Sequence, residues 1–270
     1  MPAPAKVNLF LHVTGRRADG YHTLESLFAL VDLADAIAID VRDDGAIVRT
    51  NDVADVAADD DLAIRAARAL QREAKVRAGA GIGVHKRIPM GGGLGGGSSD
   101  AASVLLALNR LWHLDWPRAR LRELGITLGA DVPFFVGGEN AVARGIGEML
   151  TPVTLPTRWL VIERPAVHVN TASVFAAPDL TRDTPSAKID VFSEGYGRND
   201  LAAVTAARFP EVADALERAP DARMTGSGAC VFVSFPTRHE AEEAMAARSR
   251  PGETFLARTL GRHPLASFAR

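Results

Sequence analysis

A glycine-rich segment next to a helix pattern constrains this chain more than any other feature of its sequence. Residues 89–99 read Pro-Met-Gly-Gly-Gly-Leu-Gly-Gly-Gly-Ser-Ser, and an apolar run rich in Ala and Leu follows at once. Glycine has no Cβ atom, so such a backbone can turn several N–H groups toward one point. Ser98 or Ser99 can cap the following helix, whose positive end faces the same point. The sequence therefore predicts an anion site, and we expect the anion to be a nucleotide phosphate.

The alternative for this segment is a flexible Gly/Ser linker. A linker is unusual between a strand, expected at residues 83–88, and a helix, expected from about residue 99 to 113. The segment is not a Walker A loop, because no Gly-Lys-Ser/Thr sequence ends it. It also lacks the acidic residue of a dinucleotide-binding fold, because Asp115 lies in a turn-like stretch. For the two serines, helix capping and phosphate contact are compatible.

The composition is that of an ordinary folded protein with one large domain or two small ones. The chain has 270 residues, 47% of them hydrophobic and 24% charged, and its formal net charge is −2. That charge argues against a nucleic acid or an anionic membrane held by bulk electrostatics. No signal-peptide pattern begins the chain, and no apolar stretch reaches the roughly 18 residues of a membrane span. We expect a cytoplasmic protein, a monomer or weak homodimer, without nucleic-acid or membrane partners.

Cysteine usage excludes two kinds of site. Cys230 is the single cysteine, so neither an intramolecular disulfide nor a cysteine metal cluster is possible. It stands in Ala-Cys-Val-Phe-Val, the pattern of a buried strand, and we expect a core thiol there.

Strand and helix patterns alternate irregularly, which predicts an α+β fold in both halves. Strands are predicted at 5–13, 24–33, 36–41, 83–88, 139–144, 148–153, 159–163, 221–225, 229–235 and 254–260. Helices are predicted at 60–76, 99–113, 117–128, 172–177, 199–208, 211–218 and 237–248, the first ended by Gly79 and Gly81. Pro152, Pro156 and the polar residues between them indicate two domains, 1–155 and 156–270, and the stretch 178–198 reads as a loop.

Two charged residues are candidate catalytic groups. Lys6 lies on the face of the first strand opposite the apolar stripe, with Asn8 on the same side. It is either a solvated surface charge or a positive charge held rigidly near a transferring phosphate. Asp131, in Gly-Ala-Asp-Val-Pro, either makes an Asx turn or projects as a base from a rigid corner. Taken singly, the residues leave both alternatives open.

Two further loops are candidates for ligand contact. Asp19-Gly-Tyr-His is a turn that presents two stackable rings, Tyr21 and His22, although a core tyrosine and a surface histidine explain it as well. Gly226-Ser-Gly-Ala-Cys, between two predicted strands, allows a close backbone approach, although a hairpin bulge explains it equally.

Together these motifs resemble the small-molecule kinase superfamily of galactokinase, homoserine kinase, mevalonate kinase and phosphomevalonate kinase. Three superfamily motifs match, in order, Pro4-Ala-Lys-Val-Asn-Leu, residues 89–99 and Thr225-Gly-Ser-Gly-Ala. The motifs Asp19-Gly-Tyr-His-Thr-Leu, Gly129-Ala-Asp-Val-Pro-Phe-Phe and Thr171-Ala-Ser-Val-Phe resemble one branch, which phosphorylates a cytidine diphosphate-linked methylerythritol in the non-mevalonate isoprenoid pathway. The resemblance covers essentially the whole chain.

The resemblance implies two domains, one like the second domain of ribosomal protein S5 and one ferredoxin-like, with the active site in the cleft between them. It implies ATP and Mg²⁺ as cofactors and a phosphoryl transfer to the 2-hydroxyl of the methylerythritol moiety. For Mg²⁺ the sequence offers no clear carboxylate cage, and Ser99 is only a weak ligand candidate.

The resemblance also assigns roles by matching position. Lys6 and Asp131 become the catalytic pair, Tyr21 stacks on the cytosine, and His22 hydrogen-bonds it. The ATP phosphates are held by Pro89, Met90, Gly91, Gly92, Gly93, Leu94, Gly95, Gly96, Gly97, Ser98 and Ser99. The rest of the substrate pocket is formed by Asn8, Thr171, Phe175, Gly226 and Ser227.

Two alternatives to this function follow from the same motifs. Another kinase of the superfamily, such as homoserine or mevalonate kinase, would keep the glycine-rich segment and Asp131 but would have no use for Asp-Gly-Tyr-His. A non-catalytic ligand-binding regulator would usually lose the base or Lys6, and both are present. Asp100 suits the first turn of a helix but would repel ATP if aimed at the phosphates, so we expect it to point away.

Overall fold

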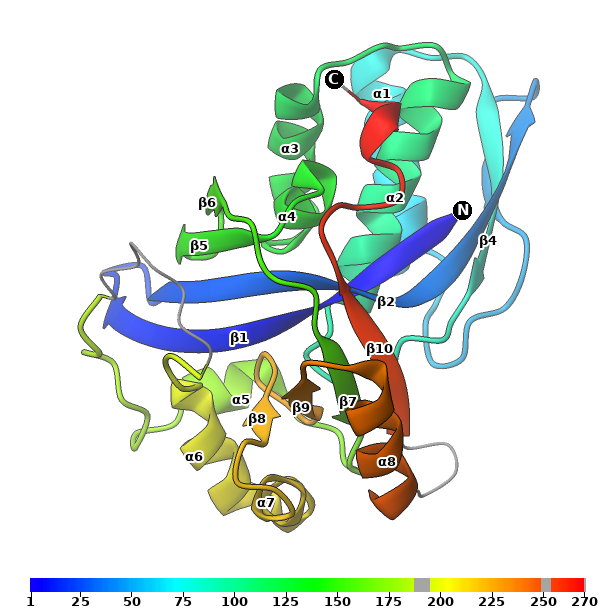
Figure 1. The fold of residues 1–270 in the computed structure, drawn as a ribbon. Coiled ribbons are helices and arrows are strands. Elements are labelled where there is room, and N and C mark those ends of the chain that lie inside the picture. Colours follow the sequence, from blue (N-terminus) through cyan, green and yellow to red (C-terminus); the bar gives the residue numbers. More distant parts are fainter. Residues whose placement is uncertain (187–194, 249–253, 270) are drawn as a thin grey trace.

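Two long antiparallel strands, β1 (Pro2–Arg16) and β2 (His22–Arg42), cross the middle of the molecule (Figure 1). The structure is a computed structural model that describes residues 1–186, 195–248 and 254–269. The other strands are β3 (Ile47–Arg49), β4 (Gly79–His85), β5 (Ala141–Gly145), β6 (Met149–Pro152), β7 (Trp159–Glu163), β8 (Arg223–Met224), β9 (Val231–Phe235) and β10 (Thr254–Leu260). The helices are α1 (Leu62–Ala74), α2 (Gly96–Leu111), α3 (Arg118–Ile126), α4 (Val132–Gly137), α5 (Thr171–Phe175), α6 (Asp200–Arg208), α7 (Pro210–Glu217), α8 (Arg238–Arg248) and the short 3-10 helix η1 (Ala266–Phe268).

One mixed sheet links the two groups of helices seen above and below β1 and β2 in Figure 1. Its order is β3-β4-β2-β10-β7-β9-β8, with β1 and β5 also paired to β2 and β6 paired to β5. Within the described residues these pairs are antiparallel, apart from β3 with β4. The prediction of an α+β fold is therefore confirmed, and the sheet is mixed.

Strand β2 differs from its prediction. Two strands were expected at 24–33 and 36–41, but a single strand of 21 residues runs through both. Ala34 and Asp35, which separate the two patterns, pair with Pro4 and Ala3 of β1. The apolar pattern is therefore interrupted within one continuous strand, and no turn separates its two parts.

Helix α1 ends earlier than predicted. Lys75, in the left-handed conformation with φ of 53°, terminates it, and the backbone N–H of Lys75 donates to the carbonyl oxygen of Arg72. Gly79 and Gly81 lie inside β4 and do not end the helix, so the strand predicted at 83–88 begins at Gly79 and ends at His85. The residue in this left-handed position is usually glycine, so the sequence did not indicate that the helix ends at Lys75.

Three short elements were not predicted. Residues 132–137 form α4, where no helix was predicted between the helix 117–128 and the strand 139–144. β3 and η1 have three residues each, too few to show a period. The flanks of the predicted loop 178–198 carry no long element between α5 and α6, and its residues 187–194 lie outside the described part of the chain.

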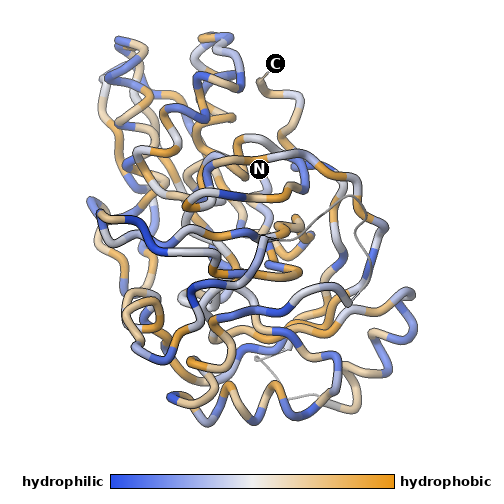
Figure 2. The backbone as a smooth tube through the Cα atoms, turned by 90° about the vertical axis from the view of Figure 1, so that its left-hand side faces the viewer, coloured by the Kyte–Doolittle hydropathy of each residue, from blue (hydrophilic) through white to orange (hydrophobic). Residues whose placement is uncertain are grey.

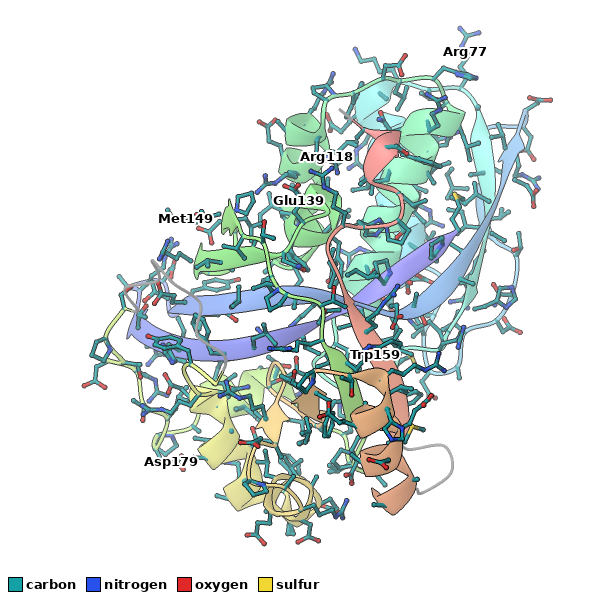
Figure 3. All side chains as sticks on the ribbon, viewed as in Figure 1. Arg77, Arg118, Glu139, Met149, Trp159 and Asp179 are labelled. Carbon is teal, nitrogen blue, oxygen red and sulfur yellow. The ribbon has the colours of Figure 1, made fainter. Side chains whose placement is uncertain are left out.

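The end of the chain returns to the first half of the molecule (Figure 1). Arg118 of α3, labelled in Figure 3 near Glu139, donates to the carbonyl oxygens of Ala266 at 2.5 Å and Ala269 at 2.9 Å. Leu265 and Ala269 are buried in the core formed around α1 and α2. The last residues therefore stabilise the helices that carry the glycine-rich segment.

Polar and apolar residues interleave along the described backbone, as the alternating blue and orange stretches of Figure 2 show. In the described parts of the chain, no helix is both long and apolar enough to span a membrane.

Candidate active site

Two cavities share the glycine-rich segment. The first, of about 360 Å³, is lined by residues 88–98 and by side chains that include Val53, Leu62, Val84 and Lys86. The second, of about 320 Å³, is lined by residues that include Lys6, Asn8, Asp131, Thr171, Phe175, Gly226 and Ser227. Gly93, Gly95 and Ser98 line both cavities. A ligand in one cavity can therefore meet a ligand in the other at these three residues.

The glycine-rich segment leaves the start of α2 open. The helix begins at Gly96, its N-cap is Gly95, and no side chain caps it. Across the described residues, no protein acceptor is found for the backbone N–H groups of Gly96, Gly97 and Ser98. Unpaired N–H groups at the positive end of a helix suit an anion. The prediction that Ser98 or Ser99 caps the helix is wrong, because the helix starts before both.

The two serines face different surroundings. Ser98 lines both cavities, and its hydroxyl has no partner among the described residues. Ser99 is fully buried, and its Oγ donates to the carbonyl oxygen of Pro4 at 2.6 Å. Ser99 thus ties α2 to β1 and is not available to a phosphate or a metal ion, which corrects its place in the predicted ATP site.

The glycine-rich segment touches the loop that follows β8. A Cβ atom on Gly93, whose φ is +75°, would lie 2.2 Å from the carbonyl oxygen of Thr225. A Cβ atom on Gly226 would lie 2.9 Å from the Cα atom of Gly93. The two loops singled out in the sequence therefore pack backbone against backbone, which only glycine permits.

Lys6 is a buried cation on β1, so the alternative of a solvated surface charge is wrong. Its residue is 4% exposed. Nζ donates to Oδ1 of Asn8 at 2.6 Å and lies 3.8 Å from Oδ2 of Asp131. Burial lowers the pKa of Lys6, and the nearby charge of Asp131 opposes that shift. The structure thus brings the two candidate catalytic residues together on the wall of the second cavity.

Asn8 organises the contacts around Lys6. Its Oδ1 also accepts from the backbone N–H of Gly226 at 2.9 Å, and its Nδ2 donates to Oγ of Ser26 at 2.8 Å. Asn8 is 2% exposed, so its hydrogen bonds to the protein occupy most of its side chain. Its main observed task is to join β1, β2 and the loop after β8.

Asp131 stands at the N-terminus of α4 and makes no capping hydrogen bond with that helix. The alternative of an Asx turn is therefore not observed. Its carboxylate is 31% exposed, unlike the side chain of Lys6. A carboxylate that is partly open to a cavity and next to a buried cation can accept a proton from a ligand hydroxyl.

Helix α5 contributes the far wall of the second cavity. Thr171 begins this helix, and its Oγ1 lies 2.7 Å from Oγ of Ser227, so the two hydroxyls form a hydrogen-bonded pair. Phe175 ends the helix, and its ring centroid lies 5.1 Å from that of His22 with an angle of 32° between the rings. Four of the predicted substrate residues are therefore adjacent in space.

Tyr21 stands apart from this group. Its side chain is 62% exposed at the turn before β2, and it does not line either cavity. The backbone N–H of Tyr21 donates to Oδ1 of Asp19 at 3.2 Å, which fixes the turn. Because its ring is exposed, Tyr21 is not a core tyrosine. The ring is free to contact a ligand.

A buried charge cluster beside the first cavity was not predicted. Nζ of Lys86 donates to Oδ2 of Asp100 at 2.7 Å and also to Asp35. Burial raises the pKa of Asp100 to about 7, while the charge of Lys86 opposes the shift. Asp100 was expected to point away from the phosphates. It lines the first cavity, but its carboxylate accepts from Lys86, and this pairing offsets its negative charge. Only four lysines occur in the chain, which marks Lys86 as unusual, but nothing in the sequence indicated Asp35.

Comparison with known proteins gives the class. Residues 61–139 match the family described as GHMP kinases N terminal domain, and residues 184–254 match GHMP kinases C terminal. A crystal structure of mevalonate kinase superimposes with a TM-score of 0.71 over 97% of this chain and 99% of that chain at 14% identity, which shows a shared fold. Together with the glycine-rich segment, these matches define the class as GHMP kinases.

More similar proteins narrow the class. A protein named 4-diphosphocytidyl-2-C-methyl-D-erythritol kinase from Thiobacillus denitrificans is 56% identical over 99% of this chain and 97% of its own length. One of the same name from Dechloromonas aromatica is 52% identical over 99% of each chain. A crystal structure of 4-(cytidine 5'-diphospho)-2C-methyl-D-erythritol kinase has a TM-score of 0.83 and 35% identity, covering 97% of this chain and 99% of that chain. The chain therefore belongs to the GHMP kinase family, in the branch of the 4-diphosphocytidyl-2-C-methyl-D-erythritol kinases.

Proposed function

We propose that this protein transfers the γ-phosphoryl group of ATP to the 2-hydroxyl of 4-diphosphocytidyl-2-C-methyl-D-erythritol, giving the 2-phosphate and ADP. The relatives of that name support the substrate. The observation that carries the proposal is the pair of cavities that share Gly93, Gly95 and Ser98, with Lys6 and Asp131 on the wall of the second. Such a pair accommodates a phosphoryl donor and an alcohol acceptor that meet at one point.

ATP is assigned to the first cavity. The unpaired N–H groups of Gly96, Gly97 and Ser98 suit its phosphates, because the helix dipole adds to their attraction for negative charge. The apolar side chains of Val53 and Leu62 suit a flat base. Residues 89–98 form this cradle, and Ser99 supports it from behind by its bond to Pro4.

Lys6 and Asp131 are assigned to the reaction itself. The hydroxyl oxygen of the acceptor forms a new bond to the γ-phosphorus, and the bond from that phosphorus to the bridging oxygen of ADP breaks. Asp131 orients the hydroxyl and accepts its proton, while Lys6 orients Asp131 and offsets negative charge at the transferring group. Because the transition state of phosphoryl transfer is loose, positioning contributes at least as much as the basicity of Asp131.

Mg²⁺ is assigned to the nucleotide phosphates. In the described chain no group of three His, Cys, Asp or Glu side chains could hold a metal ion. Mg²⁺ commonly keeps its waters and binds through substrate phosphates and one or two carboxylates, so the site fits an ion that enters with ATP. If bound with ATP, Mg²⁺ would offset the negative charge of the phosphates.

The second cavity and its rim are assigned to the acceptor. Asn8, Thr171, Gly226 and Ser227 surround the methylerythritol moiety, and the cytosine is received by Phe175, the half-buried His22 and the exposed Tyr21. A stacked ring and a hydrogen-bonding imidazole are suited to a flat base with polar edges.

The finer description of the fold is part of the proposal. We propose a domain 1–155 like the second domain of ribosomal protein S5, a ferredoxin-like domain 156–270, and an active site in the cleft between them. The run of antiparallel strands β10-β7-β9-β8 with helices α6, α7 and α8 supports the second domain. Residues 265–269 pack with the first domain by contact, although they follow the second in sequence. We propose a cytoplasmic monomer or weak homodimer without a nucleic-acid partner, in keeping with the net charge of −2.

The proposal is tested by an ADP-release assay with ATP and Mg²⁺. The diphosphocytidyl methylerythritol substrate should give saturable turnover, with mevalonate and homoserine as control acceptors. Turnover with mevalonate or homoserine instead would make the chain another kinase of the superfamily. Binding of ATP and of the diphosphocytidyl substrate without turnover would make the protein a regulator. The intact Lys6–Asp131 pair favours catalysis.

A further inference from the structure

Arg182 connects the turn after α5 to the histidine of the proposed base site. Its Nε donates to Nε2 of His22 at 3.0 Å. Its Nη1 donates to the carbonyl oxygen of Leu180 at 3.0 Å, and its Nη2 donates to those of Phe175 at 3.1 Å and Ala177 at 2.5 Å. Four hydrogen bonds therefore fix the guanidinium, and no acidic partner of Arg182 is found among the described residues.

The bond to His22 determines where the imidazole carries its proton. A guanidinium has only donors, so Nε2 of His22 must accept with its lone pair. A neutral imidazole has one N–H group, which must then be on Nδ1. A doubly protonated ring would place one N–H group against another.

The surroundings of His22 favour the neutral ring. Burial lowers the pKa of His22, and the positive charges of Arg182 and Arg16 lower it further. The other neighbouring ring, Phe175, carries no charge. No described protein group forms a hydrogen bond with Nδ1 of His22, so its N–H group is free for a ligand.

We propose that Arg182 is a positioning residue that determines base specificity by holding His22 as a donor at Nδ1. The inference rests on the proposed function, since it concerns the base of that substrate. Cytosine offers acceptors at N3 and O2, whereas the N3 of uracil carries a hydrogen. A fixed donor facing N3 therefore favours a cytidine diphosphate substrate over its uridine analogue. The same guanidinium also binds the carbonyl of Phe175, so it holds both rings of the site together.

The tautomer is tested without any substrate. The full-length protein with ¹⁵N-labelled histidine is measured by long-range ¹H–¹⁵N NMR near pH 7.5, and His22 is assigned with His22→Gln. We expect the proton on Nδ1 in the wild type and a loss of that preference in Arg182→Gln. The matched control is Arg208→Gln, because Arg208 also donates to the backbone of α5, at Ser173, but does not touch His22. A wild-type ring with its proton on Nε2, or a charged ring, would overturn the proposal.

Specificity is tested by kinetics with the cytidine and uridine forms of the substrate. Arg182→Gln should raise KM for the cytidine form about 10-fold with little change in kcat, because about one hydrogen bond is lost. The ratio of kcat/KM between the cytidine and uridine forms should fall by a similar factor, and Arg208→Gln should keep both values. Equal losses for both forms in Arg182→Gln would overturn the specificity role.

Two safeguards separate the possible failures. If the wild type phosphorylates neither form, the proposed function fails, while the NMR result still decides the tautomer. If Arg182→Gln does not fold, Arg182→Lys keeps a cationic donor, and the wild-type tautomer remains decisive by itself. Arg182→Lys should recover part of the cytidine preference, since one donor can still reach Nε2.

Discussion

The proposed catalytic corner, formed by Lys6, Asn8 and Asp131, and the proposed base rim, formed by Tyr21, His22 and Phe175, are built in opposite ways. Lys6 and Asn8 are 4% and 2% exposed, and their side chains are hydrogen-bonded to each other and to neighbouring segments. Tyr21 is 62% exposed on a turn. The corner is fixed by the protein before any ligand arrives, whereas the rim leaves contacts for the ligand to complete.

This difference separates the expected kinetic effects of the two regions. Groups fixed at the site of phosphoryl transfer stabilise the transition state, so their loss should lower kcat. Groups that contact a distant base bind the ground state and the transition state alike, so their loss should raise KM.

Replacement of the carboxylate in the corner should have the largest effect. Asp131→Asn keeps the shape of the side chain but removes its capacity to accept a proton and the negative charge beside Lys6. We expect kcat to fall by about 10²-fold or more. Steady-state kinetics with the diphosphocytidyl substrate, together with a thermal melt, would check this.

The same variant can break the comparison between the regions. If Asp131→Asn loses only a few-fold in kcat while the substrate still binds, Asp131 is not the base. If it mainly raises KM, the corner acts in binding and does not differ from the rim.

A methyl group between the two touching loops should have the next largest effect. Gly93→Ala places a Cβ atom 2.2 Å from the carbonyl oxygen of Thr225 at a φ of +75°. We expect a loss of about 2–4 kcal/mol in the free energy of unfolding, because backbone must move to relieve the overlap. Urea denaturation would measure it.

Gly97→Ala is the matched control for this substitution. Its Cβ atom would meet only the Cδ1 of Leu62, at an ordinary 3.5 Å, and Gly97 is already helical. Its stability should be unchanged or slightly higher, because alanine favours a helix. Equal losses of unfolding free energy in the two variants would mean that the contact between Gly93 and Thr225 does not stabilise the protein.

The sequence predicted the corner better than the rim, for physical reasons. The glycine-rich segment and the Thr225 loop are short motifs whose backbone requirements are visible in residue type, and the strand pattern placed Lys6 and Asn8 on one face. The class of fold followed from the mixture of periods. Convergence of Lys6 with Asp131 had to come from the resemblance, because local patterns do not report distant contacts.

Contacts between distant segments account for most of what was missed. Asp35, in the middle of β2, accepts a hydrogen bond from Lys86, which is distant in sequence. No local pattern indicates this contact. Arg182 lies in an irregular stretch and contacts His22 across the sequence. Ser99 was assigned to the ATP site because it ends the matched glycine-rich motif, but in the first turn of α2 its hydroxyl points toward β1.

Removal of the exposed ring from the rim should have a moderate effect. Tyr21→Ala should weaken binding of the diphosphocytidyl substrate by about 1–3 kcal/mol, the usual range for a stacked base. The change should raise KM and leave kcat nearly unaltered, because Tyr21 does not line the cavity that holds Lys6 and Asp131. Tyr21→Phe, which keeps the ring, is the control. An unaltered KM in Tyr21→Ala would assign another task to the ring.

The adjacent serines at the start of α2 give the smallest expected effect and the finest separation. Ser98 lines both cavities, whereas Ser99 is buried and donates to Pro4 at 2.6 Å. Ser98→Ala should raise KM for ATP by about 2- to 10-fold, the value of one hydrogen bond, without loss of stability. Ser99→Ala should instead lower the free energy of unfolding by about 1 kcal/mol, because the buried carbonyl loses its donor. Titrations of ATP and urea on both variants decide between these outcomes. The reverse pattern would place Ser99 at the phosphates and would require α2 to begin later than Gly96.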